Sequence, residues 1–126
     1  MKLINLVAIF VGGGLGSVAR FLVSRLVISV GYKSNFPLAT LLANLGACIV
    51  MALVLSFTLR DKSISESWSS FWLVGVCGGF STFSTFSYEN WLLVKDGLYG
   101  VLALNILLSV VMCVGIFVVA SRLINV

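Results

Sequence analysis

The sequence predicts an all-α membrane protein, a single transmembrane domain over residues 1–126 that contains four membrane-spanning helices. Of the 126 residues, 60% are hydrophobic and only 10% are charged, and the mean hydropathy is +1.17. Soluble domains carry about 25% charged residues. The apolar residues also fall into long stretches, and a helix needs about 20 of them to cross a bilayer. Most charged residues lie between these stretches.

The charged and metal-binding residue types disfavour several classes of function. The net charge is +4, but the basic residues are scattered, which suits membrane-flanking positions better than a nucleic-acid surface. The chain has no histidine, and its three cysteines lie in separate apolar stretches. A metal cluster, a disulfide framework and an enzyme active site are therefore disfavoured. Cys48, Cys77 and Cys113 are best interpreted as small buried hydrophobic side chains.

The first helix is expected over about residues 3–30. A signal peptide is the rival interpretation, but the stretch is too long for one and Arg20 interrupts it. Gly12 and Gly16 form a small-xxx-small pair, which allows another helix to pack closely.

Arg20 is the most informative charge in this helix, and two interpretations of it stay open. An arginine within a span is costly and generally faces a partner or a water-filled vestibule. Alternatively, its side chain reaches the membrane interface, with Arg25 as the true interfacial anchor.

The second helix is expected over about residues 36–59, with Pro37 in its first turn. Thr40 and Asn44 are spaced i, i+4 and so share a face. Asn44 has apolar neighbours, and its amide either bonds to a neighbouring helix or offers its donors to a passing anion.

The third helix is expected over about residues 68–94, with a break near residues 78–82. Gly78 and Gly79 each weaken a helix by about 1 kcal/mol relative to alanine. Hydroxyl groups then alternate with phenylalanines in an otherwise apolar span: Phe80, Ser81, Thr82, Phe83, Ser84, Thr85, Phe86 and Ser87. This pattern indicates either a helix-packing face or a broken helix that lines a polar pathway.

The residue types around this break suit ions. Phenylalanine rings carry partial positive charge at their edges, so an anion could meet a ring edge beside hydroxyl donors. Backbone carbonyls freed at a helix break could coordinate a small cation.

The fourth helix is expected over about residues 98–124, with Asn105 and Ser109 as its polar face. Basic residues flank the two sides of this predicted bundle almost equally: Lys2, Arg60, Lys62 and Arg122 against Arg25, Lys33 and Lys95. Such balance is compatible with insertion in both orientations and with an antiparallel homodimer. A fixed orientation that charge counting does not resolve is the alternative.

Three segments form a recognisable set. They are Gly-Gly-Gly-Leu-Gly-Ser-Val-Ala-Arg at Gly12 to Arg20, Ala-Thr-Leu-Leu-Ala-Asn at Ala39 to Asn44, and Gly-Gly-Phe-Ser-Thr-Phe-Ser-Thr-Phe-Ser at Gly78 to Ser87. In sequence and order they resemble the Fluc/CrcB family of fluoride channels over essentially the whole chain. The third segment is the most specific of the three.

The resemblance implies a dual-topology, antiparallel homodimer in the inner or plasma membrane. It implies two pores that passively export cytoplasmic fluoride. By the same resemblance, Phe83, Phe86 and Asn44 line the pore, and three hydroxyl residues line or support it: Ser84, Thr85 and Ser109.

The resemblance also implies roles for a cation site and a vestibule. Gly78 and Ser81 match positions whose backbone carbonyls hold a structural sodium ion at the dimer centre. Arg20 matches the arginine of the first helix, where it would attract anions. Ala39 stands where glycine is common in the family, and Ser81 stands where threonine is common.

Two other functions remain as alternatives. A small proton-coupled multidrug transporter needs a membrane-embedded carboxylate, and Glu89 is the only acid within a predicted span. A non-transporting assembly subunit would explain the small-residue faces but not the alternating phenylalanines and hydroxyls. Fluoride itself comes from the resemblance, because hydroxyl donors and ring edges do not by themselves exclude chloride.

Overall fold

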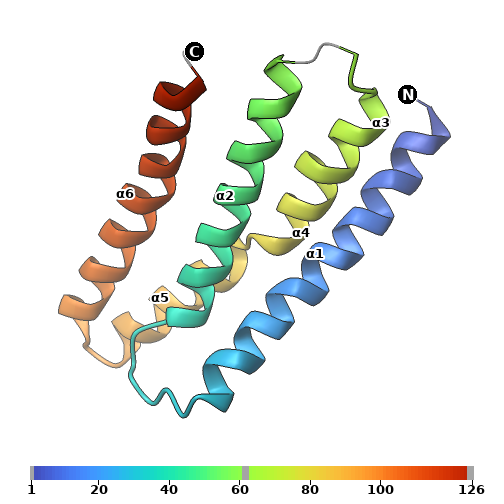
Figure 1. Ribbon diagram of the computed structural model, residues 1–126. Coiled ribbons are helices and arrows are strands. Elements are labelled where there is room, and N and C mark those ends of the chain that lie inside the picture. Colours follow the sequence, from blue (N-terminus) through green and yellow to red (C-terminus); the bar gives the residue numbers. More distant parts are fainter. Residues whose placement is uncertain (1, 61–62, 125–126) are drawn as a thin grey trace.

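The computed structural model describes residues 2–60 and 63–124, and within them every regular element is helical (Figure 1). The predicted all-helical fold is confirmed. Seven elements follow one another: α1 (Leu3–Ser29), α2 (Leu38–Arg60), α3 (Glu66–Ser69), the π-helical segment η1 (Ser70–Val76), α4 (Cys77–Phe80), α5 (Phe83–Lys95) and α6 (Tyr99–Ile124).

In the part of the chain that the structure describes, three helices, α1, α2 and α6, are long and apolar enough to cross a membrane. Their most apolar windows have mean hydropathies of 1.9, 2.4 and 2.8. The start of α1 lies at the same end of the molecule as the ends of α2 and α6 (Figure 1). These three helices alone make the chain suited to a bilayer.

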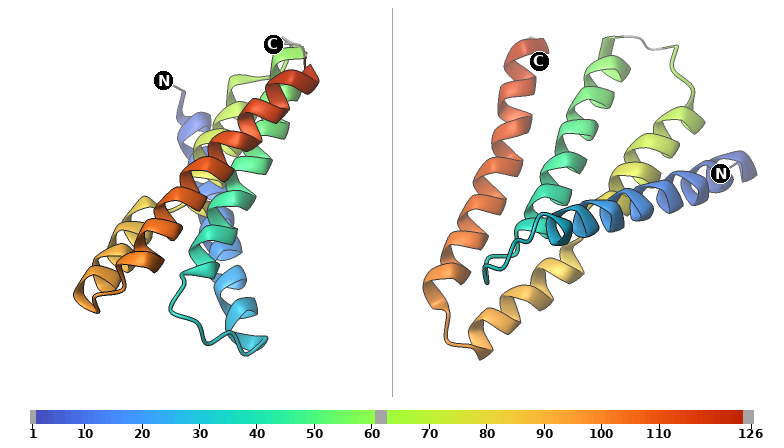
Figure 2. Two further views of the ribbon diagram at one scale, coloured as in Figure 1. Left: turned by 90° about the vertical axis from the view of Figure 1, so that its left-hand side faces the viewer. Right: turned by 60° about the horizontal axis from the view of Figure 1, so that its bottom comes forward.

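The third apolar stretch is interrupted, as the sequence indicates, but the interruption follows the glycines instead of including them. Gly78 and Gly79 remain helical in α4, while Ser81 and Thr82 have extended backbone, with ψ of 157° and 115°. The helical glycines have a packing reason: a Cβ on Gly79 would collide with the carbonyl oxygen of Gly13. After the break, α5 runs in a different direction from η1 (Figure 2).

Close contact between α1 and the η1–α4 segment depends on glycines. A Cβ on Gly12 would meet the Phe71 carbonyl oxygen, and one on Gly16 would meet the Val76 carbonyl oxygen. From the other side, a Cβ on Gly75 would lie 2.9 Å from the Gly12 Cα. The two backbones therefore touch directly, which is how small residues bring membrane helices together.

Two glycines end helices in left-handed backbone. Gly31 follows α1 with φ of 74°, and Gly97 follows α5 with φ of 71°. After α5, the Gly97 N–H donates to Val94 and the Leu98 N–H donates to Leu93, the paired bonds of a Schellman motif. The resulting short turn leads directly into α6. Asp61 and Lys62 lie outside the described residues. Lys62 is one of the basic residues counted above on the two sides of the predicted bundle.

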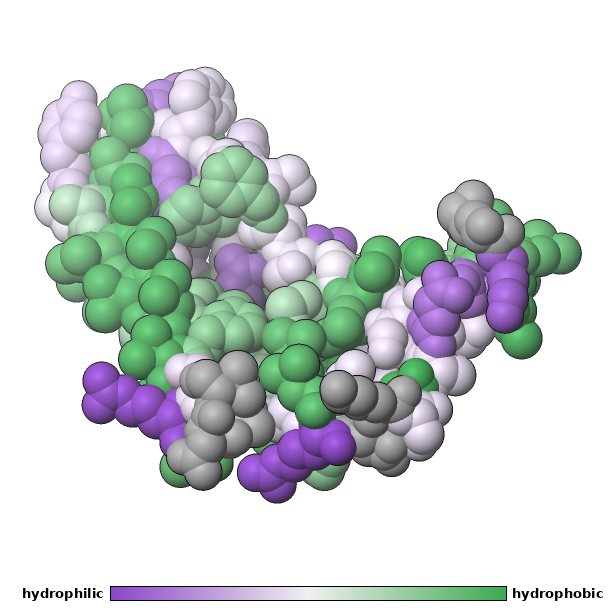
Figure 3. All heavy atoms as spheres, turned by 90° about the horizontal axis from the view of Figure 1, so that it is seen from above, coloured by the Kyte–Doolittle hydropathy of each residue, from purple (hydrophilic) through white to green (hydrophobic). Residues whose placement is uncertain are grey.

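The outer surface is apolar. Many large hydrophobic side chains are exposed, Phe10 being 82% exposed, and Figure 3 shows apolar side chains over much of the surface seen from above. Several buried residues are instead small or polar, including Ala43, Ala47, Asn90 and Asn105. An apolar outer surface with polar side chains among the buried residues is the distribution expected where hydrocarbon surrounds the chain.

Candidate functional site

The break in the third stretch is held by one side chain from α2. The Thr82 N–H donates to Asn44 Oδ1 at 2.8 Å, and Asn44 Nδ2 lies 3.5 Å from the Thr82 carbonyl oxygen. Asn44 therefore replaces the helical partners that the interruption removes from Thr82. The sequence left two partners open for the Asn44 side chain, a neighbouring helix and an anion. The amide oxygen of Asn44 has the first kind of partner, because it accepts from the backbone of Thr82. One Asn44 N–H is still available for an ion.

The N-terminus of α5 carries a cluster of three hydroxyl groups. Thr82 Oγ1 accepts from the Thr85 N–H at 3.2 Å, which caps the helix. The same oxygen donates to Thr85 Oγ1 at 3.1 Å and lies 3.3 Å from Ser84 Oγ. Since the single Thr82 proton goes to Thr85, the hydroxyl proton of Thr85 stays free to donate elsewhere. Ser84 and Thr85 are both exposed.

Phe83 and Phe86 form an aromatic pair on the first turn of α5. Their ring centroids are 6.0 Å apart and their planes are tilted by 36°. Phe83 is 80% exposed, although it is a large apolar side chain beside exposed hydroxyl groups. The structure thus places the two phenylalanines and the Ser84 and Thr85 hydroxyl groups on the same short segment.

The carbonyl groups at the end of α4 have lost helical partners. In a continuous helix the Thr82 N–H would bond to the Gly78 carbonyl oxygen, but here it bonds to Asn44. Gly78 is also exposed, and among the described residues no atom beyond its own stretch of helix lies within 4 Å of where its Cβ would be. Gly78 and Ser81 therefore offer backbone oxygens of the kind that a hard monovalent cation prefers.

Ser109 is buried in a polar chain that links α5 to α6. Its hydroxyl group donates to Asn105 Oδ1 at 3.5 Å, and Asn105 Nδ2 donates to Asn90 Oδ1 at 2.8 Å. Asn105 is only 1% exposed. Ser109 is thus not brought into the Phe83 and Thr85 cluster by any hydrogen bond among the described residues.

Sequence reasoning missed two of these polar contacts. It noted the Asn105 and Ser109 spacing but not Asn90, whose amide inside an apolar run was the available signal. It also noted Thr40 and Glu89 separately, whereas Thr40 Oγ1 donates to Glu89 Oε1 at 2.8 Å. Glu89 Oε2 is buried and has no hydrogen-bond partner among the described residues.

Arg20 lies on α1, about one helical turn beyond Gly16, which touches α4. Its side chain is partly buried. No ion pair to Arg20 is found in residues 2–60 and 63–124. The structure therefore leaves both sequence-based interpretations of this arginine open.

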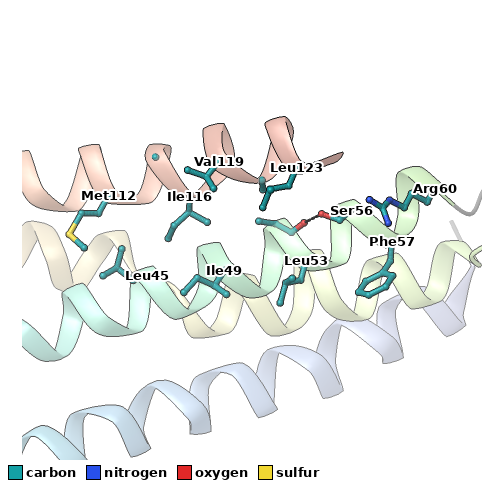
Figure 4. Close-up of a pocket in the computed structure, with 13 residues that line it drawn as sticks. Leu45, Ile49, Leu53, Ser56, Phe57, Arg60, Met112, Ile116, Val119 and Leu123 are labelled. Atoms are coloured by element: carbon teal, nitrogen blue, oxygen red, sulfur yellow. Dashed lines mark hydrogen bonds between the residues drawn. The ribbon is translucent and has the colours of Figure 1, made fainter. Parts of the chain in front are cut away.

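The groove between α2 and α6 does not resemble an anion site. It encloses about 700 Å³ and its lining is almost entirely aliphatic and aromatic (Figure 4). The Ser56 hydroxyl group donates to the Ala52 carbonyl oxygen at 2.6 Å, so its proton is already used. Among the residues that the structure describes, Arg60 is the only charged one in the lining, and it lies at one end. The polar groups that suit an ion are instead those around the α4–α5 break.

Comparison with known proteins identifies the family. Residues 7–121 match the family profile described as CrcB-like protein, Camphor Resistance (CrcB). The chain belongs to the CrcB family. A protein of Azobacteroides pseudotrichonymphae named "Fluoride-specific ion channel FluC" is 41% identical over 111 residues, which cover 88% of this chain and 86% of the relative.

Two further relatives carry the same name. The Coxiella burnetii protein is 41% identical over 87% of this chain and 89% of its own length. The Pyrococcus abyssi protein is 36% identical over 97% of this chain and 100% of its own length. This CrcB-family chain is a multi-pass membrane protein, as its apolar helices also indicate.

The contact between Asn44 and Thr82 predicts a stability effect in this CrcB-family chain. Replacing Asn44 with leucine leaves the Thr82 N–H and carbonyl group without partners, at an expected cost of about 1–3 kcal/mol for each group that stays buried. Asn44→Asp keeps an acceptor for the 2.8 Å bond from the Thr82 N–H but loses the donor to the Thr82 carbonyl oxygen, so it is expected to keep only the first contact. Thermal unfolding of the purified variants measures the difference. Equal stability of Asn44→Leu and the wild type would contradict the bracing role.

Proposed function

We propose that this chain is a fluoride-selective channel that lets cytoplasmic fluoride leave the cell passively through the inner or plasma membrane. The observation that carries the proposal is the exposed segment at the α4–α5 break, where Phe83 and Phe86 lie beside the Ser84 and Thr85 hydroxyl groups. The relatives named as fluoride-specific ion channels support fluoride as the ion. A channel forms and breaks no covalent bonds, so the protein is not an enzyme.

The chemistry of this segment suits a small anion. The free Thr85 hydroxyl proton and one Asn44 N–H are uncharged donors. The positive edges of the Phe83 and Phe86 rings add weak attraction without a counter-charge. Such sites replace part of a hydration shell yet bind weakly enough for the ion to leave, which conduction requires. Partly buried Arg20 would raise the local anion concentration near the entrance.

The proposal includes four membrane spans, with η1–α4 and α5 together forming the third, and an antiparallel homodimer. One chain leaves Phe83, Ser84 and Thr85 uncovered. Hydroxyl groups facing hydrocarbon are costly, so a second copy that encloses them is favoured. The near balance of basic residues on the two sides is compatible with an inverted partner.

A structural sodium ion at the centre of that dimer is also part of the proposal. The Gly78 carbonyl oxygen, which loses its Thr82 donor, and the Ser81 carbonyl oxygen are the ligands that one chain would supply. Two carbonyl groups are too few for a sodium ion, and the same pair from an inverted copy would complete the set. The bound charge would hold the two breaks together and favour anions nearby.

The test is ion efflux from liposomes that contain the purified protein, followed with fluoride- and chloride-selective electrodes. Voltage-driven fluoride efflux with little chloride movement is the expected result. The matched control is liposomes without protein.

Two outcomes would overturn the channel. If the folded protein passes neither anion, the channel proposal is rejected. If it instead transports an organic cation coupled to protons, and Glu89→Gln abolishes that transport, the protein is a transporter. Equal passage of chloride would reject fluoride selectivity but keep an anion channel.

A further inference from the structure

Asn90 lies on the same face of α5 as the two phenylalanines. Phe83, Phe86 and Asn90 are spaced by three and four residues, so their side chains project along one stripe of the helix. The stripe goes from 80% exposed at Phe83 to 9% exposed at Asn90. Figure 2 shows the reason: α5 and α6 are joined by the turn at Gly97 and spread apart toward the break. Phe83 is thus the first residue of α5 after the break, and Asn90 lies about two turns further along the same helix, toward α6.

The orientation of the Asn90 amide is fixed from α6. Asn105 is buried, and its oxygen accepts from Ser109, so its amide nitrogen is the group that faces Asn90. Asn105 Nδ2 donates to Asn90 Oδ1 at 2.8 Å. The carbonyl oxygen of Asn90 is therefore held toward α6, and its NH₂ group points away from Asn105.

That NH₂ group has no acceptor within residues 2–60 and 63–124. Glu89 Oε2 is the one fully enclosed polar side-chain atom of that region without a partner, so the Asn90 nitrogen is not sealed inside the protein. Its two N–H donors are therefore unpaired within those residues and belong to the same stripe of α5 as Phe83 and Phe86. The two hydrogen bonds run in one direction, from Ser109 to Asn105 and from Asn105 to Asn90, and such alignment strengthens the final donor.

We propose that the Asn90 amide is a further binding site for the permeating anion, with Asn105 as the residue that positions it. The inference rests on the proposed channel function. An anion moving from the Phe83–Phe86 pair toward the Gly97 end of α5 meets these two donors next. A neutral amide suits the task, because it replaces water donors without holding the anion as an arginine or lysine would.

Three variants test the assignment. Asn90→Asp keeps an acceptor for the 2.8 Å bond from Asn105 and removes both donors. The double variant Asn90→Leu with Asn105→Leu removes the donors without adding charge and leaves neither of the two amides unpaired, while Ser109 loses Asn105 Oδ1 as its acceptor. Asn5→Asp is the matched control: Asn5 is a buried amide whose oxygen accepts from the Ser67 hydroxyl group at 2.7 Å, on α1 and not on α5.

Fluoride efflux from liposomes is the measurement, with gel filtration and thermal unfolding as checks of the fold. Loss of a charge-assisted hydrogen bond is expected to lower efflux about tenfold or more in Asn90→Asp and in the double variant. Asn5→Asp is expected to match the wild type.

Wild-type efflux in a folded double variant would overturn the assignment, because Asn90 and Asn105 would then only join α5 to α6. An equal fall in fluoride efflux in Asn5→Asp would also overturn the assignment. A wild-type protein without fluoride efflux would reject the channel itself together with the assignment, whereas intact wild-type efflux with unaffected Asn90 variants rejects the assignment alone.

Discussion

Replacing Phe83 with isoleucine is expected to lower fluoride efflux by about two orders of magnitude, equivalent to ~3 kcal/mol at tenfold per 1.4 kcal/mol. The substitution keeps an apolar side chain but removes the ring edge that an anion would meet. Phe83 is 80% exposed, so little internal packing is lost. The pair with Phe86, whose ring centroid lies 6.0 Å away, is lost as well.

Phe10→Ile is the matched control for this experiment. Phe10 is 82% exposed, which is nearly the same as Phe83, but it lies on α1. The two variants make the same chemical change on similarly exposed side chains. Liposome efflux that is unchanged in Phe83→Ile, or reduced equally in Phe10→Ile, would show that the ring of Phe83 does not take part in conduction.

Replacing Gly16 with alanine is expected to destabilise the fold by about 2 kcal/mol or more, within the range typical of overpacking. The added Cβ would collide with the Val76 carbonyl oxygen and approach the Phe80 nitrogen to 2.8 Å. Both obstacles are backbone atoms, so α1 itself must move away from η1 and α4. Because α4 ends at the break, this movement also displaces the candidate ion site.

Gly14→Ala provides the control on the same helix. Within residues 2–60 and 63–124, no atom outside the neighbouring turns of α1 lies within 4 Å of the position that a Cβ would take on Gly14. The change is expected to stabilise α1 slightly, by up to about 1 kcal/mol, because alanine favours a helix over glycine. Thermal unfolding in detergent compares the two variants. A Gly16→Ala protein as stable as Gly14→Ala would contradict the close helix contact.

The apolar spans, the interruption and the polar residue set could be predicted from the sequence because they depend on local properties. Hydropathy over about 20 residues determines whether a helix suits a bilayer. The dense hydroxyl groups between Phe80 and Ser87 indicated either a helix-packing face or a break, and Thr82 before α5 is an ordinary helix-capping residue. Family membership was also carried by local motifs, the segment from Gly78 to Ser87 above all.

The position of the break and the partners of its polar groups were decided by tertiary contacts. The glycines weaken a helix wherever they occur, yet Gly79 stays helical because α4 packs against Gly13. Thr82 leaves the helix because Asn44, 38 residues earlier, takes its N–H. Asn90 acquires a direction only from Asn105 on the next helix. A hydrogen bond between distant residues depends on how the helices pack, and side-chain spacing within one helix does not contain that information.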